Sequence, residues 1–180
     1  MKKFLGIIVV MALIVGGFAA FFACATPATG AVEVRVTDAP PGNITSVNVT
    51  VDEIMIHRAG AGNESGWENI TIVDNTFDLL QAAGNETVIG YARSVGAGNY
   101  TQLRMHIVSV NVTMGNQTLP ASVPSDWLKF VRPFEVVNGG TTTLVIDFDA
   151  DQSIVVTGAG DVKFLPVIRL LVREGQGPPD

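Results

Sequence analysis

The amino-acid sequence predicts an all-β protein, an antiparallel β-sandwich of about nine strands with an immunoglobulin-like or prealbumin-like arrangement. Three observations lead to this prediction. Apolar and polar residues alternate with a period of two through most of the chain, and β-branched residues dominate these runs. Glycine, proline and asparagine separate the runs. Only residues 78–83 have a helix-forming composition, which is enough for one short helical turn.

The first predicted strand is a short valine run. Val32, Val34 and Val36 alternate with charged residues, so one face of this strand is apolar. The segment Asp38–Gly42 contains two prolines, which end the run. One possibility for this strand, which lies beside a spacer, is an unpaired terminal strand at 31–37 that can leave its sheet.

The next two predicted strands each change parity near their middle. In residues 46–57 the apolar positions are odd in the first half and even in the second, so a bulge near Asp52-Glu53 is needed to keep both sets on the core side. A strand over 103–112 shows the same change, which places Val108 on the apolar face with the even positions that follow it. Long, bulged strands of this kind bend around a sandwich core.

The other connections and strands follow from turn residues. Gly115-Asn116 predicts a tight hairpin, and Asn138-Gly139-Gly140 predicts another. Gly-Ala-Gly recurs at 60–63, 96–99 and 158–161, and we interpret these segments as loops because no helix follows to form a phosphate site. The remaining strands are predicted at 67–73, 86–92, 117–123, 128–137, 141–149, 152–157 and 161–173.

The first 24 residues predict export. Lys2 and Lys3 precede an uncharged apolar run, Phe4–Ala23, and Cys24 follows it directly. Three fates remain open: lipidation of Cys24 after lipobox-like cleavage, cleavage that releases a soluble protein, and retention as a helix, since 20 residues span about 30 Å. In each case the protein works outside the membrane, either anchored to its outer face or secreted.

Domain organisation and composition narrow the function further. Residues 1–24 are the signal or anchor segment, 25–30 a spacer, 31–173 the sandwich domain and 174–180 a disordered tail. The chain has 17 acidic and 11 basic residues, for a net charge of −6. Such an acidic chain is a poor partner for nucleic acid, whose phosphates require a basic face. With one cysteine no disulfide forms within the chain, so stability comes from packing.

Eight Asn-x-Ser/Thr sequons indicate glycosylation, which takes place outside the cytoplasm. Asn48 and Asn111 lie on the predicted solvent side of their strands, and most of the others lie in loops. The density of sequons is typical of archaeal surface proteins. The eight positions are Asn43, Asn48, Asn63, Asn69, Asn85, Asn99, Asn111 and Asn116.

Three carboxylates form the best candidate metal site. Alternation along a strand places Asp147, Asp149 and Asp151 on one side, and oxygen ligands at this spacing suit Ca²⁺. The alternative is a solvated strand end with no ion. Asp38 joins the group if its strand is a neighbour, or it caps the turn formed by the two prolines.

Aromatic residues form the candidate ligand platform. Trp67 and Trp127 lie beside predicted loops, where their rings could stack on sugars together with Tyr91 and Tyr100; packing in the core or at its rim is the alternative.

The sequence contains no convincing catalytic group, so we predict no catalytic residue and a protein that is not an enzyme. His57 and His106 could bind zinc with an aspartate, but their spacing does not require it, and exposed strand histidines are the simpler interpretation. Ser94 has no nucleophile-elbow context around it.

A series of short motifs occurs in a fixed order along the chain. The motifs are Thr37-Asp38-Ala39-Pro40, Gly66-Trp67, Phe77-Asp78-Leu79-Leu80, the segment Gly98–Arg104, Asp147-Phe148-Asp149 and Leu165-Pro166-Val167-Ile168. In this order they resemble the domain-of-unknown-function 4382 family of exported prokaryotic lipoproteins. The resemblance covers about residues 31–170 and implies location and domain extent, but no activity.

The function that follows is a non-enzymatic, membrane-anchored, glycosylated surface module that binds a glycan or a neighbouring surface protein, or has a structural or adhesive role. Two alternatives remain. One is a calcium-dependent carbohydrate-binding or adhesion domain that uses the three aspartates. The other is a subunit of a surface polymer in which the terminal strand at 31–37 enters the sheet of another copy.

Overall fold

The computed structural model of the protein describes residues 27–39 and 44–176. The predicted anchor segment, the sequon at Asn43 and the last four residues of the predicted tail lie outside these ranges.

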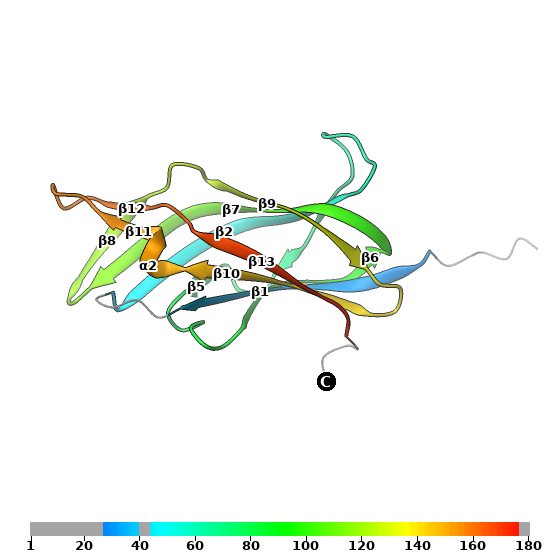
Figure 1. Ribbon diagram of the computed structural model, residues 1–180, viewed down its shortest axis with the longest axis horizontal. Helices are drawn as coiled ribbons and strands as arrows, with labels where there is room; N and C mark the ends of the chain where they lie inside the picture. Colours follow the sequence, from blue (N-terminus) through cyan, green and yellow to red (C-terminus); the bar gives the residue numbers. More distant parts are fainter. Residues whose placement is uncertain (1–26, 40–43, 177–180) are drawn as a thin grey trace, which may run out of the picture.

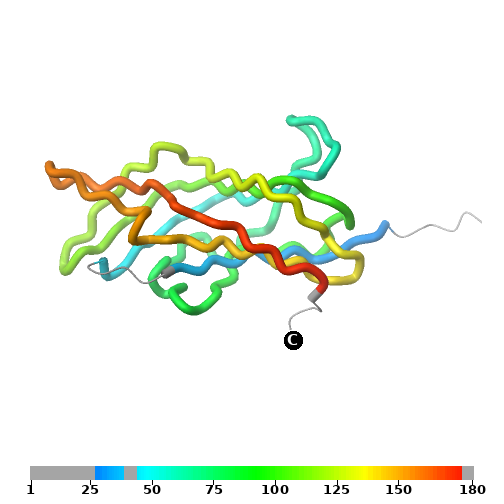
Figure 2. The backbone as a smooth tube through the Cα atoms, in the orientation of Figure 1, coloured from blue at the N-terminus to red at the C-terminus, as the bar shows by residue number. Residues whose placement is uncertain are grey.

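Two mixed β-sheets pack face to face around one hydrophobic core (Figure 1), which confirms the all-β, sandwich-like fold. Figure 2 traces the backbone through both sheets, from blue near the N-terminus to red near the C-terminus. The first sheet, here sheet A, has the strand order β13 (Ile168–Gln176), β10 (Thr141–Asp149), β1 (Thr29–Ala39), β6 (Thr87–Gly96) and β4 (Thr71–Ile72).

The second sheet, sheet B, has eight strands. Two of them lie off the main path: β5 (Thr76–Asp78) pairs with β2, and β9 (Trp127–Val136) pairs with β7. The order along the main path is β11 (Ile154–Val156), β12 (Val162–Phe164), β8 (Gln117–Ser122), β7 (Gly98–Met114), β2 (Ser46–Arg58) and β3 (Trp67–Asn69).

Each sheet contains one parallel pair, so the expectation of a purely antiparallel sandwich is wrong in this respect. β1 runs parallel to β10, from Ala31 opposite Thr141 to Ala39 opposite Asp149. β8 runs parallel to β12 over a shorter stretch. Both pairs join strands that are not connected by a hairpin, because the chain crosses to the other sheet between them.

The strand β1 lies in the middle of sheet A. It is parallel to β10 on one side and antiparallel to β6 on the other. The expectation of an unpaired terminal strand is therefore wrong, and transfer of β1 to another copy would first break both ladders.

The predicted bulge near Asp52-Glu53 is confirmed. Thr50 is opposite Ser109, Val51 is opposite Ile107 and Glu53 is opposite His106, so Asp52 and Val108 are each left without a partner in register. Val108 is 55% exposed, against its predicted place on the buried face. From Leu103 to Ile107 the buried positions of β7 are odd, and from Val110 onward they are even. Val108 and Ser109 lie between these two sets, and neither of them is buried.

The chain changes sheets at a single residue in two places. The run 67–73 divides into β3 in sheet B and β4 in sheet A, with buried Ile70 between them. The predicted loop at 96–99 is also shorter than expected, because β6 passes into β7 at Ala97 alone. Gly98 has φ +135°, a conformation that glycine adopts without strain, and this allows the sharp crossing.

The hairpin turn at 115–116 and the loops at 60–63 and 158–161 are confirmed. Residues 138–140 do form a turn, but the predicted hairpin there is wrong, because β9 and β10 on either side of it belong to different sheets. Residues 79–82 form hydrogen-bonded turns, with Ala82 N 3.3 Å from Asp78 O. The sequence did not predict the short helix α2 (Ala150–Ser153), which replaces the start of an expected strand. Within the described ranges, no helix has both the length and the apolar composition to cross a membrane.

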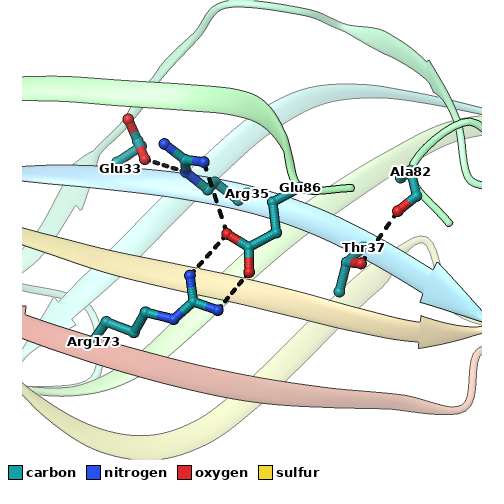
Figure 3. A network of polar contacts seen from close by, with 6 residues as sticks. All are labelled: Glu33, Arg35, Thr37, Ala82, Glu86 and Arg173. Atoms are coloured by element: carbon teal, nitrogen blue, oxygen red, sulfur yellow. Dashed lines mark hydrogen bonds and ion pairs between the residues drawn. The ribbon is translucent and has the colours of Figure 1, made fainter. Parts of the chain in front are cut away.

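Charged side chains tie three segments together on the outer face of sheet A (Figure 3). Arg35 on β1 pairs with Glu33 and also lies 3.7 Å from Glu86, just before β6. Arg173 on β13 donates from Nη1 to Glu86 at 2.8 Å, and this hydrogen bond lowers the pKa of Glu86. The network therefore links β1 to the segment just before β6 on one side and to β13 on the other.

Candidate functional site: a tryptophan–arginine platform

The candidate site lies on the outer face of sheet B, where β3, β2, β7 and β9 run side by side. Leu103 and Met105 on β7 are fully buried in the core. Because successive side chains of a strand point to opposite faces, Arg104 between them points outward. Its neighbours in register are Met55 on β2 and Lys129 on β9.

The guanidinium of Arg104 is held between two indole rings. Its Cζ lies 3.9 Å from the ring centroid of Trp67 and 4.6 Å from that of Trp127. Trp67 begins β3 and Trp127 begins β9, so each ring leans across from the edge toward β7. Arg104 also donates from Nε and Nη2 to the sulfur of Met55, at 3.1 and 2.8 Å. These contacts fix a cation at the surface.

A histidine packs against the outer side of each tryptophan. The ring centroids of His57 and Trp67 are 4.6 Å apart, and those of His106 and Trp127 are 4.9 Å apart. We call these five residues the Trp–Arg platform: His57, Trp67, Arg104, Trp127 and His106.

Backbone carbonyls hold the His57 end of the platform. His57 is buried, and its Nε2 lies 3.1 Å from Gly62 O and 3.0 Å from Ser65 O. Trp67 Nε1 donates to Asn63 O at 3.0 Å. The loop between β2 and β3 therefore positions both rings.

Two carboxylates hold the other end. His106 Nδ1 lies 2.6 Å from Asp52 Oδ1, and Nε2 lies 3.5 Å from Asp126 Oδ2. The hydrogen bond to Asp52, assisted by the nearby Asp126 carboxylate, raises the pKa of His106. Asp52 is the bulged residue of β2, so the bulge that keeps the core in register also places a carboxylate on this imidazole.

The charge of Arg104 is not neutralised within the described part of the chain. Neither Arg104 nor its neighbour Lys129 forms an ion pair there. The ion pairs of the described residues involve Arg35, Arg58, His106, Arg169 and Arg173. Arg93, Arg132 and Lys163 also form no ion pair within the described ranges, but Arg104 and Lys129 are direct neighbours in register, which places two such cations side by side.

A shallow hollow lies on each side of the Arg104 stack. The first is about 190 Å³ and is lined by His57, Asn63, Trp67, Gln102, Arg104 and Lys129. The second is about 500 Å³ and includes Asp52, Asn69, His106 and Trp127. Each hollow offers an indole ring and at least one side-chain amide, which can bond hydroxyl groups. Within the described part of the chain, only the second is lined by carboxylates, those of Asp52 and Glu53.

Of the four predicted aromatic residues, only Trp67 and Trp127 meet on this face. Tyr100 is fully buried, with its Oη 2.6 Å from Glu68 Oε1 and 2.8 Å from Gly96 O. Burial, followed by the hydrogen bond to Glu68, raises the pKa of Tyr100. Tyr91 lies on β6, in the opposite sheet. The residue that the ligand prediction missed is Arg104, which joins the two tryptophans.

The three aspartates predicted to bind Ca²⁺ have separate roles. Asp147 Oδ2 accepts from Arg169 Nη2 at 2.7 Å. Asp149 caps α2 through the backbone N–H of Gln152, at 3.1 Å. Asp151 lies in the first turn of α2, so the alternation that would align it with the other two ends at Asp149.

Asp38 does lie beside these residues, since its strand pairs with β10, but its Oδ1 accepts from Ala150 N at 2.9 Å. Across residues 27–39 and 44–176, no group of three or more His, Cys, Asp or Glu side chains is arranged to hold a metal ion. The two histidines lie at opposite ends of the platform. Binding of Ca²⁺ to Asp147, Asp149 and Asp151 stays a prediction without such a group to support it.

The sequons that the structure describes have exposed or half-exposed asparagines. Asn48 and Asn111 are opposite each other on β2 and β7, on the outer face of sheet B. Asn63 and Asn69 line the two hollows of the platform. Glycosylation of these positions stays a prediction.

Comparison with known proteins identifies a family. A family model described as "Domain of unknown function (DUF4382)" matches residues 29–166. No curated protein matches the chain. Among solved structures, a "putative cell adhesion protein" from Bacteroides eggerthii DSM 20697 is 13% identical with a TM-score of 0.35, over 83% of this chain and 57% of that one. A likeness this weak carries no argument about function.

Proposed function

The chain belongs to the DUF4382 family, and from this premise we propose that it is an exported, non-enzymatic β-sandwich module that binds a surface glycan or surface protein through the Trp–Arg platform. One observation carries the proposal: Arg104 is fixed between Trp67 and Trp127 on an open sheet face. Aromatic rings and arginine are the residue types that dominate binding energy at protein surfaces.

The preorganisation of the platform supports a binding role. The side chains of the platform are positioned by Met55, by backbone carbonyls and by carboxylates before any partner arrives. A rigid surface loses little conformational entropy on binding, so more of its contact energy appears as affinity.

The proposed location rests on the sequence. The apolar run that ends at Cys24 and the sequons behind it favour export and attachment to the outer face of the membrane. Intact-mass measurement of the protein purified from native membranes would report its N-terminus, acyl chains and glycans together. An unprocessed, unmodified chain in the cytosol would contradict this part of the proposal.

A glycan array tests the binding role. The full chain, kept in a non-ionic detergent, is applied as wild type and as Trp67→Ala and Trp127→Ala. We expect each variant to lose about tenfold or more in affinity for whatever glycans the wild type retains, because each removes one wall of the platform. Tyr91→Ala on sheet A is the matched control and should bind as the wild type does.

The outcome that would contradict the binding role is equal retention of ligands by the wild type and both tryptophan variants, with melting temperatures unchanged. The same array read with EDTA tests calcium dependence. The platform contacts involve nitrogen, sulfur and ring atoms and need no metal, so we expect binding to persist.

A further inference from the structure

We propose that the ligand of the Trp–Arg platform is an acidic saccharide, and that its carboxylate pairs with Arg104 while its ring lies against Trp67 or Trp127. The inference deepens the proposed binding function and rests on it. It assigns a chemical class to the ligand and a role to one side chain.

The hydrogen bonds of Arg104 leave its charge available. Nε and Nη2 donate only to the sulfur of Met55, which is a weak acceptor. Nη1 has no hydrogen-bond partner within the described part of the chain. The two indole rings lie 3.9 and 4.6 Å from Cζ, so a ligand contacts the N–H groups that the rings and Met55 leave open. The N–H donors along one edge of a guanidinium match the geometry of a carboxylate, so two of them can donate to its two oxygens at once.

Nearby charges favour an anion at this place. Lys129 is the direct neighbour of Arg104 in register and is exposed without an ion pair within the described ranges. Asp52 and Asp126 lie at the far end of the platform, where the imidazole of His106 bonds both. Glu53 also lies at that far end, whereas no carboxylate of the described residues lines the hollow that contains Arg104 and Lys129.

The remaining groups suit a sugar more than a simple anion. The hollow beside Arg104 brings together the ring of Trp67, the amides of Gln102 and Asn63, and Lys129. Amides bond hydroxyl groups, and an indole face packs against the C–H groups of a sugar ring. The acidic composition of the protein opposes nucleic acid, which also carries anions and rings.

Isothermal titration of the full chain in non-ionic detergent tests the inference. The probes are trigalacturonate and its fully methyl-esterified form, which keeps the rings and hydroxyls but lacks the charge. We expect the acid to bind about tenfold or more tightly than the ester, because a charge-assisted bidentate pair is lost in the ester. The titrations are run on native protein and on enzymatically deglycosylated protein, and an acid preference in either form supports the inference.

Variants assign the preference to one residue. In Arg104→Gln we expect the ratio between acid and ester to fall to about one, since no fixed cation remains. Lys163→Gln on β12 removes the same charge elsewhere in sheet B and should leave the ratio unchanged. If Arg104→Gln melts below the assay temperature, Arg104→Lys replaces it and should keep only part of the preference, because lysine lacks the planar edge.

Equal binding of acid and ester by the wild type, an unchanged ratio in Arg104→Gln, or binding of neither probe would overturn the inference. These results leave the binding role standing if the array still shows glycans that depend on Trp67 and Trp127. Loss of that dependence as well would remove both.

Discussion

Side chains on the outer face of sheet B position one another, together with two carboxylates and the carbonyls of the loop between β2 and β3. Arg104 contacts two tryptophans and a methionine, and each tryptophan contacts a histidine. Removal of any one member therefore leaves its neighbours less constrained. The consequences can be measured at individual residues.

The first residue-scale prediction concerns pH. The folded pKa of His106 is raised, mainly by its hydrogen bond to Asp52, so protonation of His106 favours the folded state. Its contribution is complete below the unfolded pKa and is lost as the pH rises through the higher, folded pKa. Glu53, opposite His106 in register, is a further acidic neighbour.

Chemical denaturation of the wild type and of His106→Gln measures this effect. We expect the difference in unfolding free energy between the two proteins to be larger at about pH 5 than at about pH 9. At the higher pH the imidazole of the wild type is neutral, as the glutamine of the variant always is. Titration of the imidazole by NMR gives the folded pKa directly. A folded pKa at or below the ordinary value would contradict the prediction.

The second residue-scale prediction concerns metal. Arg169 pairs with Asp147, and Asp149 caps α2, so Ca²⁺ would have to displace both interactions. We expect millimolar Ca²⁺ to leave the melting temperature unchanged. A rise that disappears in Asp147→Asn would restore the calcium site predicted from the sequence.

The sequence could predict where the platform residues point but not that they meet. Arg104 lies between the apolar residues Leu103 and Met105, and because side chains alternate along a strand this already indicates that Arg104 points outward. Trp67 and Trp127 reach it from β3 and β9, and no local spacing relates the three positions. Their contact depends on strand register, which only the folded sheet establishes.

At the scale of elements, the bulge shared by β2 and β7 is the feature that most determines the site. It lets both strands keep an apolar inner face along their whole length while the sheet bends. Its position was predictable because the alternation of side chains along a strand can be read from neighbouring residues, and a bulge appears as a change in the parity of the apolar positions. The split of 67–73 into two strands was not, since the crossing at Ile70 is set by the core that it enters.

A pair of valines tests the bulge. Val108 is 55% exposed at the bulge, whereas Val110 is 1% exposed on the core side. We expect Val110→Asp to lower the unfolding free energy by about 3 kcal/mol or more, because it buries an unpaired charge. Val108→Asp should change it by less than about 0.5 kcal/mol. Equal destabilisation by the two changes in urea denaturation would contradict the register shift.

At the scale of the whole molecule, β1 lies between β10 and β6 and so joins the two halves of sheet A. The sequence identified β1 as a strand from its alternating valines, but it could not show that the strand is central or that one neighbour is parallel. Parallel pairing joins segments far apart in the chain, so local patterns contain no record of it.

Two truncations test this placement. A chain of residues 27–180 keeps every described strand, and we expect its melting temperature to match that of the full chain. A chain of residues 40–180 lacks β1, which leaves β10 and β6 without their common neighbour, so we expect it to lose cooperative thermal unfolding. A cooperative transition in the shorter chain would show that sheet A does not need β1.

The central position of β1 also determines when the protein can finish folding. Asp38 at the end of β1 bonds Ala150, which is 112 residues further along the chain. A nascent chain has no partner for this side of β1 until most of it has been synthesised, and such distant pairings form slowly. Sheet A therefore cannot be completed before β10 has been synthesised, however early β1 and β6 are available.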